Sequence, residues 1–154
     1  MIDTPRIIQT TSRLAAILRL TIPRSEIQAV MGPGIGEVMA AVKAEGSAPS
    51  GPWFTHHLTM DPAIFDFEIC VPISAPIAAV GRVACGEMPA VRVARTIHHG
   101  PYDGLDAAWS AFDKWIVANG HVAGPDLYEC YVAGPESSSN PADWRTELSR
   151  PLIG

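Results

Sequence analysis

Hydrophobic residues in the first half of the chain are spaced for strands around a helical segment. In residues 64–73 apolar and polar side chains alternate, which predicts a strand with one buried face. Apolar residues at helical spacing predict a short helix over residues 26–31, a break at Gly32-Pro33, and a second helix that ends at Gly46. The predicted strands of this half cover residues 14–22, 53–59 and 64–73.

The same order of elements returns in the second half. A strand over residues 90–97 is followed by a helix that opens at Gly100-Pro101 and runs to about Ala118. Its apolar residues recur at intervals of three and four, which predicts one buried stripe. Asn119-Gly120 ends the helix. The strands that follow are predicted over residues 127–132 and 144–152.

The shared order of strand, helix, strand and strand predicts an internal duplication. Gly32-Pro33 recurs as Gly100-Pro101, and Glu68 four residues before a proline recurs as Glu147. We therefore expect an α+β fold in which tandem strand-helix-strand-strand modules form an antiparallel sheet with two main helices about a pseudo-twofold axis. A single domain over residues 1–154 would hold module one at about 10–75 and module two at about 80–154, with a concavity where the modules meet.

Charge and cysteine content exclude several functional classes. The chain has 154 residues, with 11 Lys and Arg against 16 Asp and Glu, and the net charge is -5. Because no stretch concentrates the cations, direct binding of nucleic acid is not expected. The three widely spaced cysteines fit reduced thiols. No apolar run approaches the roughly 20 residues of a membrane span, and no signal peptide opens the chain, so a cytoplasmic protein without membrane contact is expected.

Several stretches resemble the GyrI-like small-molecule-binding family. The family includes the effector domains of AraC-type and BmrR-type multidrug-sensing regulators and a stand-alone gyrase inhibitor. The resemblance implies a fold like the BmrR effector domain, with an aromatic-lined central pocket whose glutamate meets cationic ligands. Further matches lie around Arg24, Gly32-Pro33 and residues 68–72. The main matching stretches are Thr96-Ile-His-His-Gly-Pro-Tyr-Asp-Gly-Leu105, residues 115–120, Tyr128-Glu-Cys-Tyr-Val132 with Gly134-Pro135, and residues 146–152.

Glu129 is the charged residue that the resemblance singles out. It is the one charge in residues 127–132, so an ionised carboxylate there needs a partner or a pocket if it is buried. From the residues alone, a glutamate on an edge strand that points into solvent is an equally good interpretation. Side chains on a strand alternate, which places Tyr131 and Leu127 on the face of Glu129.

Three further aromatic residues are candidate ligand contacts. Tyr102 belongs to the Gly-Pro-Tyr motif of the family and is otherwise a helix staple. Trp109 lies on the apolar stripe of the second helix, where core packing is the usual role. Trp53 begins a predicted strand and would line the site from the first module, or pack in the core. The predicted ligand-binding residues are Glu129, Tyr131, Tyr102, Trp109 and Trp53.

The other polar residues with notable positions are not predicted to form a functional site. His56-His57 and His98-His99 are neighbours on strands and point to opposite faces, so neither pair can chelate one ion, and no metal or cofactor is expected. Glu68 and Glu147 have equivalent places in the repeat. We expect them to cap backbone donors or to pair with Arg92, Arg95 or Arg145 across strands.

Three functions are consistent with these features. The first is a stand-alone module that captures a hydrophobic or cationic small molecule. The second is a hydrolase of cyclopropane-bearing toxins, as in some GyrI-like proteins, with Glu129 as the catalytic residue that orients or deprotonates water. The third is a protein-binding role like that of the gyrase inhibitor. Residues 1–154 show no helix-turn-helix pattern, so we expect transcription regulation to need a separate DNA-binding partner.

Overall fold

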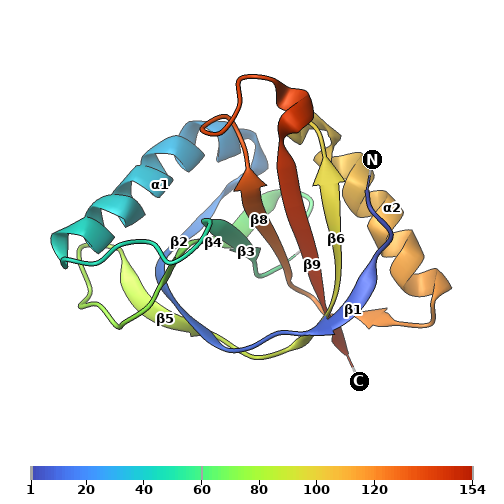
Figure 1. Cartoon of the computed structure of the whole chain (residues 1–154), viewed down its shortest axis with the longest axis horizontal. Coiled ribbons are helices and arrows are strands. Elements are labelled where there is room, and N and C mark those ends of the chain that lie inside the picture. Colours follow the sequence, from blue (N-terminus) through green and yellow to red (C-terminus); the bar gives the residue numbers. More distant parts are fainter. Residues whose placement is uncertain (1, 60, 154) are drawn as a thin grey trace. The chain divides into compact units, whose positions relative to one another are not determined.

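The computed structural model describes residues 2–59 and 61–153 of the chain. These residues form two compact units, one of Thr11–Ala90 and one of Met1–Thr10 with Val91–Gly154. Strands pair in antiparallel fashion within each unit, and each unit has one main helix (Figure 1). The predicted α+β class is therefore confirmed.

The unit Thr11–Ala90 has its strands in the order β3-β4-β2-β5. The central pair is long: β2 and β4 pair over ten residues, from Leu14 opposite Ile73 to Pro23 opposite Ile64. This register continues the alternation seen in the sequence, so one face of the sheet is apolar. The elements are β2 (Arg13–Pro23), the 3-10 helix η1 (Arg24–Glu26), α1 (Ile27–Ala44), β3 (Phe54–His57), β4 (Ile64–Ile73) and β5 (Ala84–Met88).

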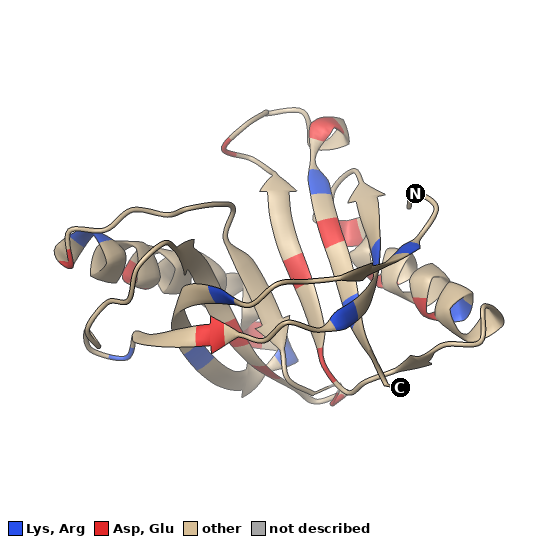
Figure 2. Ribbon diagram, turned by 60° about the horizontal axis from the view of Figure 1, so that its bottom comes forward, with Lys and Arg blue, Asp and Glu red and all other residues tan. Residues whose placement is uncertain are grey.

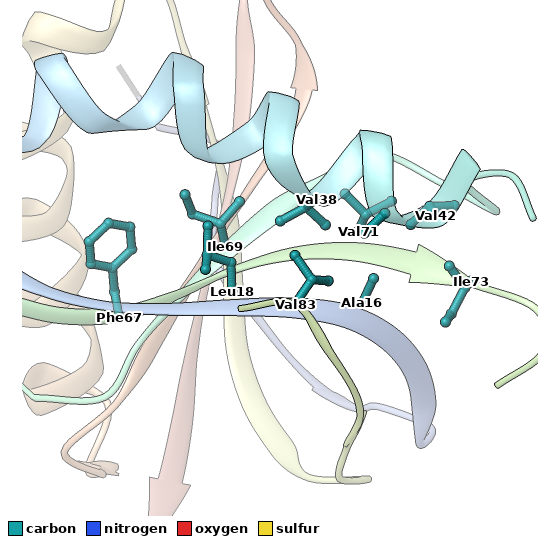
Figure 3. Packing of buried hydrophobic residues seen from close by; sticks show 10 residues of the cluster. Ala16, Leu18, Val38, Val42, Phe67, Ile69, Val71, Ile73 and Val83 are labelled. Atoms are coloured by element: carbon teal, nitrogen blue, oxygen red, sulfur yellow. The ribbon is translucent and has the colours of Figure 1, made fainter. Parts of the chain in front are cut away.

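Helix α1 covers the apolar face of this sheet. Val38 and Val42 on the helix face Ile69 and Val71 on β4 (Figure 3). All four side chains are almost fully buried. Burial of a side chain of this size stabilises the fold by about 1.5–3 kcal/mol. Packing of the helix against the sheet therefore stabilises this unit.

The predicted break at Gly32-Pro33 is wrong. One continuous helix, α1, runs from Ile27 to Ala44 with Pro33 inside it. A proline there costs about 3 kcal/mol because it removes a backbone hydrogen bond. The helix must continue past the proline because Gly34, Val38 and Val42, which follow it, are buried against the sheet. Packing of the helix against the sheet thus outweighs the helix-breaking tendency of Pro33.

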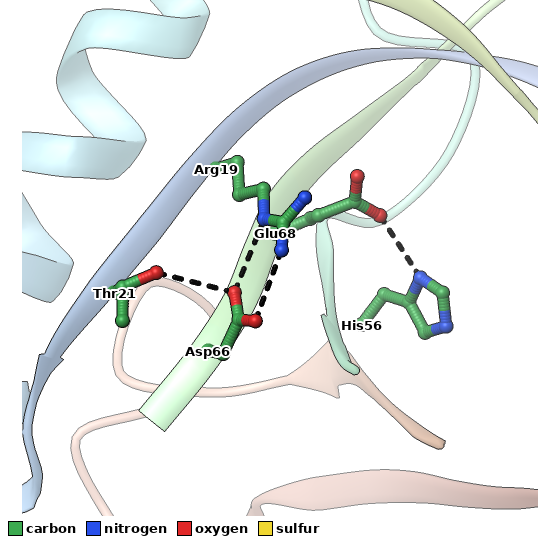
Figure 4. Close-up of polar contacts among 5 residues, drawn as sticks. All are labelled: Arg19, Thr21, His56, Asp66 and Glu68. Carbon is green, nitrogen blue, oxygen red and sulfur yellow. Dashed lines mark hydrogen bonds and ion pairs between the residues drawn. The ribbon is translucent and has the colours of Figure 1, made fainter. Parts of the chain in front are cut away.

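The polar face of the sheet carries pairs of polar and charged side chains (Figure 4). Arg19 on β2 donates two hydrogen bonds to Asp66, at 3.1 and 3.0 Å. Glu68 lies 2.9 Å from Nδ1 of His56. The predicted arginine partner is therefore wrong for Glu68, because β3 places His56 directly opposite it. For Glu147 the prediction is confirmed, with Arg95 at 3.4 Å.

His57 makes the stability of this unit sensitive to acid. Its ring stacks on Phe67 at 5.2 Å, and burial lowers its pKa from 6.5 to about 4. Between these values the unfolded chain binds a proton that the folded chain does not, so stability falls as pH falls. We expect a loss of roughly 2 kcal/mol from pH 7 to pH 5 from this residue. Urea unfolding of wild type and His57→Phe between pH 7 and pH 5 measures this loss. If the free energies of unfolding of the two proteins change with pH in parallel, the prediction is contradicted.

The second unit has its strands in the order β1-β6-β9-β8, with β7 paired to β9. Its elements are β1 (Arg6–Gln9), β6 (Arg92–His99), η2 (Tyr102–Gly104), α2 (Leu105–Ala118), β7 (Val122–Ala123), β8 (Leu127–Ala133), η3 (Pro141–Asp143) and β9 (Arg145–Ile153). The series β6, α2, β8 and β9 matches β2, α1, β3 and β4 in both chain order and pairing order. The predicted tandem order of strand, helix, strand and strand is therefore confirmed.

Two short edge strands, β1 and β5, were not predicted. The strand β1 directly precedes β2 in the chain yet pairs with β6, and β5 precedes β6 yet pairs with β2. Each unit therefore takes one edge strand from the segment that leads into the other unit. At four and five residues these strands are too short to give a clear alternation.

Candidate functional site

One face of the second sheet holds two of the predicted site residues, Glu129 and Tyr131. Glu129 on β8 lies opposite Leu148 on β9, and Tyr131 lies opposite Thr146. Leu148 packs against Phe112 of α2 in the core of this unit. Since side chains on one strand alternate, Glu129 and Tyr131 share the face that α2 covers.

The carboxylate of Glu129 accepts a hydrogen bond at each oxygen. Nε1 of Trp109 donates to Oε2 at 2.6 Å, and the hydroxyl of Tyr131 donates to Oε1 at 2.8 Å. The first bond joins α2 to β8, and the second joins two residues of one strand. The alternative of a glutamate that points into solvent is therefore not what the structure adopts. Both donors are neutral, so neither compensates the negative charge of the carboxylate.

Burial raises the pKa of Glu129 above its ordinary value. The hydrogen bonds from Trp109 and Tyr131 act in the opposite direction because they stabilise the charged form. Asp106 raises the pKa further and His98 lowers it. The residue is half-buried, so solvent still reaches part of it. A carboxylate of this kind is held in place, poorly hydrated and partly accessible.

Aromatic rings continue from this carboxylate along the same face. The Tyr102 ring meets the Tyr131 ring edge-on at 5.8 Å and lies 5.0 Å from the Trp144 ring. The rings of Trp109 and Phe112 are 5.7 Å apart. We call Glu129 and the four aromatic residues that follow from it the Glu129 cluster. Its members are Glu129, Trp109, Tyr131, Tyr102 and Trp144.

The backbone around the cluster leaves room for these rings. Tyr102 starts η2 directly after Gly100-Pro101, where Gly100 has a φ of 116° that other residues rarely adopt. A Cβ atom on Gly134 would lie 2.5 Å from the Tyr102 hydroxyl. The glycine of the Gly134-Pro135 motif therefore permits the position of Tyr102. Burial, with Glu136 and Glu129 nearby, raises the pKa of the Tyr102 phenol, so the phenol is neutral at pH 7.

Four of the five predicted ligand-binding residues come together here, namely Glu129, Tyr131, Tyr102 and Trp109. Trp53 belongs to the unit Thr11–Ala90, where it packs against the core, and the predicted strand start at this residue shifts to Phe54. Sequence reasoning missed Trp144 because it was counted as the first residue of a strand. Its position between a Pro- and Ser-rich loop and β9 is the signal that could have found it.

The histidine pairs do not form a common site. His56 contacts Glu68, whereas His57 stacks on Phe67. His99 contacts Asp3 at 2.7 Å. Within residues 2–59 and 61–153, no group of three or more His, Cys, Asp or Glu side chains is placed to hold a metal ion.

Figure 2 shows acidic and basic positions interspersed over strands and helices, without a basic stripe along any described element. None of the helices in the described ranges has the length and apolar character needed to cross a bilayer.

Comparison with known proteins decides the family. The sequence model of the GyrI-like small molecule binding domain matches residues 3–153. The chain belongs to this GyrI-like family. The resemblance carried by residues 96–105 and 128–135 is thereby confirmed over nearly the whole chain. No curated protein sequence matches the chain significantly.

Solved structures of other proteins share this GyrI-like fold. The EcmrR C-terminal domain has a TM-score of 0.86 at 23% identity over 97% of both chains. In the EcmrR-DNA complex, the chain spans only 57% of the EcmrR length. SAV2435 bound to tetraphenylphosphonium has a TM-score of 0.74 at 12% identity, covering 99% of this chain and 95% of that one. A hydrolase from Listeria innocua reaches 0.62 at 12%, covering 97% and 92%.

Proposed function

We propose that this GyrI-like domain binds a hydrophobic cation at the Glu129 cluster. The observation that carries the proposal is the poorly hydrated carboxylate of Glu129, whose two hydrogen bonds come from the neutral groups of Trp109 and Tyr131. When this carboxylate is ionised, neither donor supplies a positive charge that balances it. A lipophilic cation supplies the missing positive charge at little desolvation cost of its own.

The rings of the cluster favour the same ligand class. Tyr131, Tyr102 and Trp144 form a series of ring contacts that starts beside the carboxylate. A cation over an aromatic face gains about 0.5–2 kcal/mol, and the apolar body of the ligand gains from leaving water. SAV2435, which shares the fold, was solved bound to tetraphenylphosphonium, a cation of this kind. Tetraphenylphosphonium is therefore the natural first probe.

The test compares two ions of the same size and opposite charge. We expect tetraphenylphosphonium to bind with micromolar affinity in calorimetric titration and to quench tryptophan fluorescence. Tetraphenylborate has the same four rings but a negative charge, and we expect it to bind at least tenfold more weakly because the Glu129 carboxylate repels it. Equal affinities would mean that the site recognises apolar surface alone and would contradict the proposal.

A hydrolase is the second candidate. The observation that favours it is the raised pKa of Glu129 beside the Tyr131 hydroxyl, a combination suited to general-base activation of water. A hydrolase from Listeria innocua shares the fold. Incubation with a cyclopropane-bearing electrophile distinguishes the two functions. Hydrolysed product that forms with wild type and not with Glu129→Gln supports catalysis, and binding without product supports capture alone.

A further inference from the structure

Two buried polar atoms lie beside the Glu129 cluster without a hydrogen-bond partner. They are Nδ1 of His98 and Oγ1 of Thr146, on residues that are 2% and 0% exposed. A buried polar atom without a partner costs about 1–3 kcal/mol. Such atoms call for an explanation, and two of them in one place indicate a common cause.

These two residues occupy one row across three strands. His98 on β6 is directly opposite Thr146 on β9, and Thr146 is directly opposite Tyr131 on β8. The adjacent row holds Thr96, Leu148 and Glu129. The unpartnered atoms therefore belong to the face of the sheet that carries the Glu129 carboxylate.

The hydrogen-bonding capacity of each atom follows from its neighbours. Nε2 of His98 lies 3.0 Å from the carbonyl oxygen of Pro101. A carbonyl oxygen only accepts, so Nε2 carries the hydrogen, and in the neutral form of the ring Nδ1 is an acceptor. The hydroxyl of Thr146 can both donate and accept. The group that matches both atoms at once is a hydroxyl, which donates to His98 and accepts from Thr146.

The helix η2 covers this row. A Cβ atom on Gly104 would lie 3.0 Å from Cε1 of His98, so the backbone of η2 rests on the imidazole edge. The side chain of Tyr102, at the start of η2, is held by ring contacts with Tyr131 and Trp144. Access of a ligand group to this row requires the Tyr102 ring to move.

We infer that His98 and Thr146 form a polar subsite for an alcohol group on a ligand whose cationic centre lies at Glu129. The inference rests on the proposed function and makes it more specific. It predicts that the domain prefers hydrophobic cations that carry a hydroxyl over cations of the same size without one. The buried atoms then gain partners in the complex, whereas an apolar group at the same place leaves them unsatisfied.

The test uses two matched pairs of phosphonium ions. Triphenylphosphonium with a hydroxymethylphenyl group is compared with its ethylphenyl analogue, in the para and the meta isomer, by calorimetric titration. The ethyl compounds are more apolar and would bind more tightly at a site without polar atoms. We expect the hydroxymethyl compound of at least one isomer to bind three to ten times more tightly than its ethyl analogue.

Variants at Thr146 test whether the preference for the hydroxymethyl compound arises at this residue. Thr146→Val keeps the shape and removes the hydroxyl, so we expect it to abolish the hydroxymethyl preference. Thr146→Ser keeps the hydroxyl and should retain the preference. Because the Thr146 hydroxyl has no partner in the free protein, we expect Thr146→Val to have a melting temperature no lower than that of wild type.

Three outcomes would overturn the subsite. They are a wild-type preference for the ethyl compound in both isomers, a hydroxymethyl preference that survives Thr146→Val, and a crystal structure of the complex in which His98 and Thr146 bind an ordered water only. Failure of the proposed function is a separate result, since then none of the phosphonium ions binds. If a variant fails to fold, the wild-type comparison together with the crystal structure of the complex decides the inference.

Discussion

Glu129→Gln is expected to weaken the binding of tetraphenylphosphonium by about 10- to 100-fold, which corresponds to roughly 1.4–2.8 kcal/mol. Glutamine keeps the size of the side chain and can still accept from Trp109 through its oxygen and donate to Tyr131 through its amide. The variant therefore removes the negative charge with little change in packing. Calorimetric titration at pH 7 gives the change in affinity directly.

The same variant has a second signature in stability. Burial raises the pKa of Glu129, so keeping the carboxylate ionised at neutral pH costs the folded state free energy. We expect Glu129→Gln to be at least as stable as wild type at pH 7. We also expect cation binding by wild type to decline as the pH falls through the raised pKa of Glu129, and binding by the variant to be much less sensitive. If Glu129→Gln is both unstable and unable to bind, the loss of binding cannot be assigned to the missing negative charge.

Glu147→Gln is the matched control. Glu147 lies on β9 opposite Cys130, so it belongs to the other face of the same sheet, where it pairs with Arg95. Its replacement changes the net charge by the same amount as Glu129→Gln. We expect a change in tetraphenylphosphonium affinity of less than twofold. Equal losses in the two variants would assign the effect to the overall field of the protein and not to the Glu129 cluster.

Phe112→Ala is expected to destabilise the second unit by about 3–5 kcal/mol. Phe112 is 0% exposed and packs with Ile116 and Leu148 between α2 and the sheet. Its ring also lies 5.7 Å from that of Trp109, which donates to Glu129. The substitution leaves a cavity behind the cluster, so we expect weaker tetraphenylphosphonium binding together with the loss of stability.

Urea unfolding followed by tryptophan fluorescence measures this effect. Val117→Ala is a suitable control, because Val117 lies on the same helix and is 74% exposed. We expect that substitution to change the stability by less than about 0.5 kcal/mol. A loss below about 1.5 kcal/mol in Phe112→Ala would indicate that the space behind Trp109 closes up and that the core of this unit tolerates repacking.

The repeated pattern of the sequence predicted most of the fold. Alternation in residues 64–73 and the apolar stripe of residues 105–116 correspond to β4 and α2. These patterns are reliable because each buries one face along its whole length. The helical conformation at Pro33 and the short strands β1 and β5 could not be predicted from these patterns. Their conformations depend on partners that lie far away in the sequence.

The candidate site also combines features that local spacing predicts with features that depend on tertiary packing. By itself the sequence determined the family, the order of the elements and the strand that carries Glu129 and Tyr131 on one face, because local spacing fixes which side chains share a face. Only the tertiary structure decided that Trp109, twenty residues earlier in the chain, donates to Glu129, and that Trp144 joins the rings. Spacing along a helix shows which residues face inward, but the group each one meets depends on how the helix and the sheet pack.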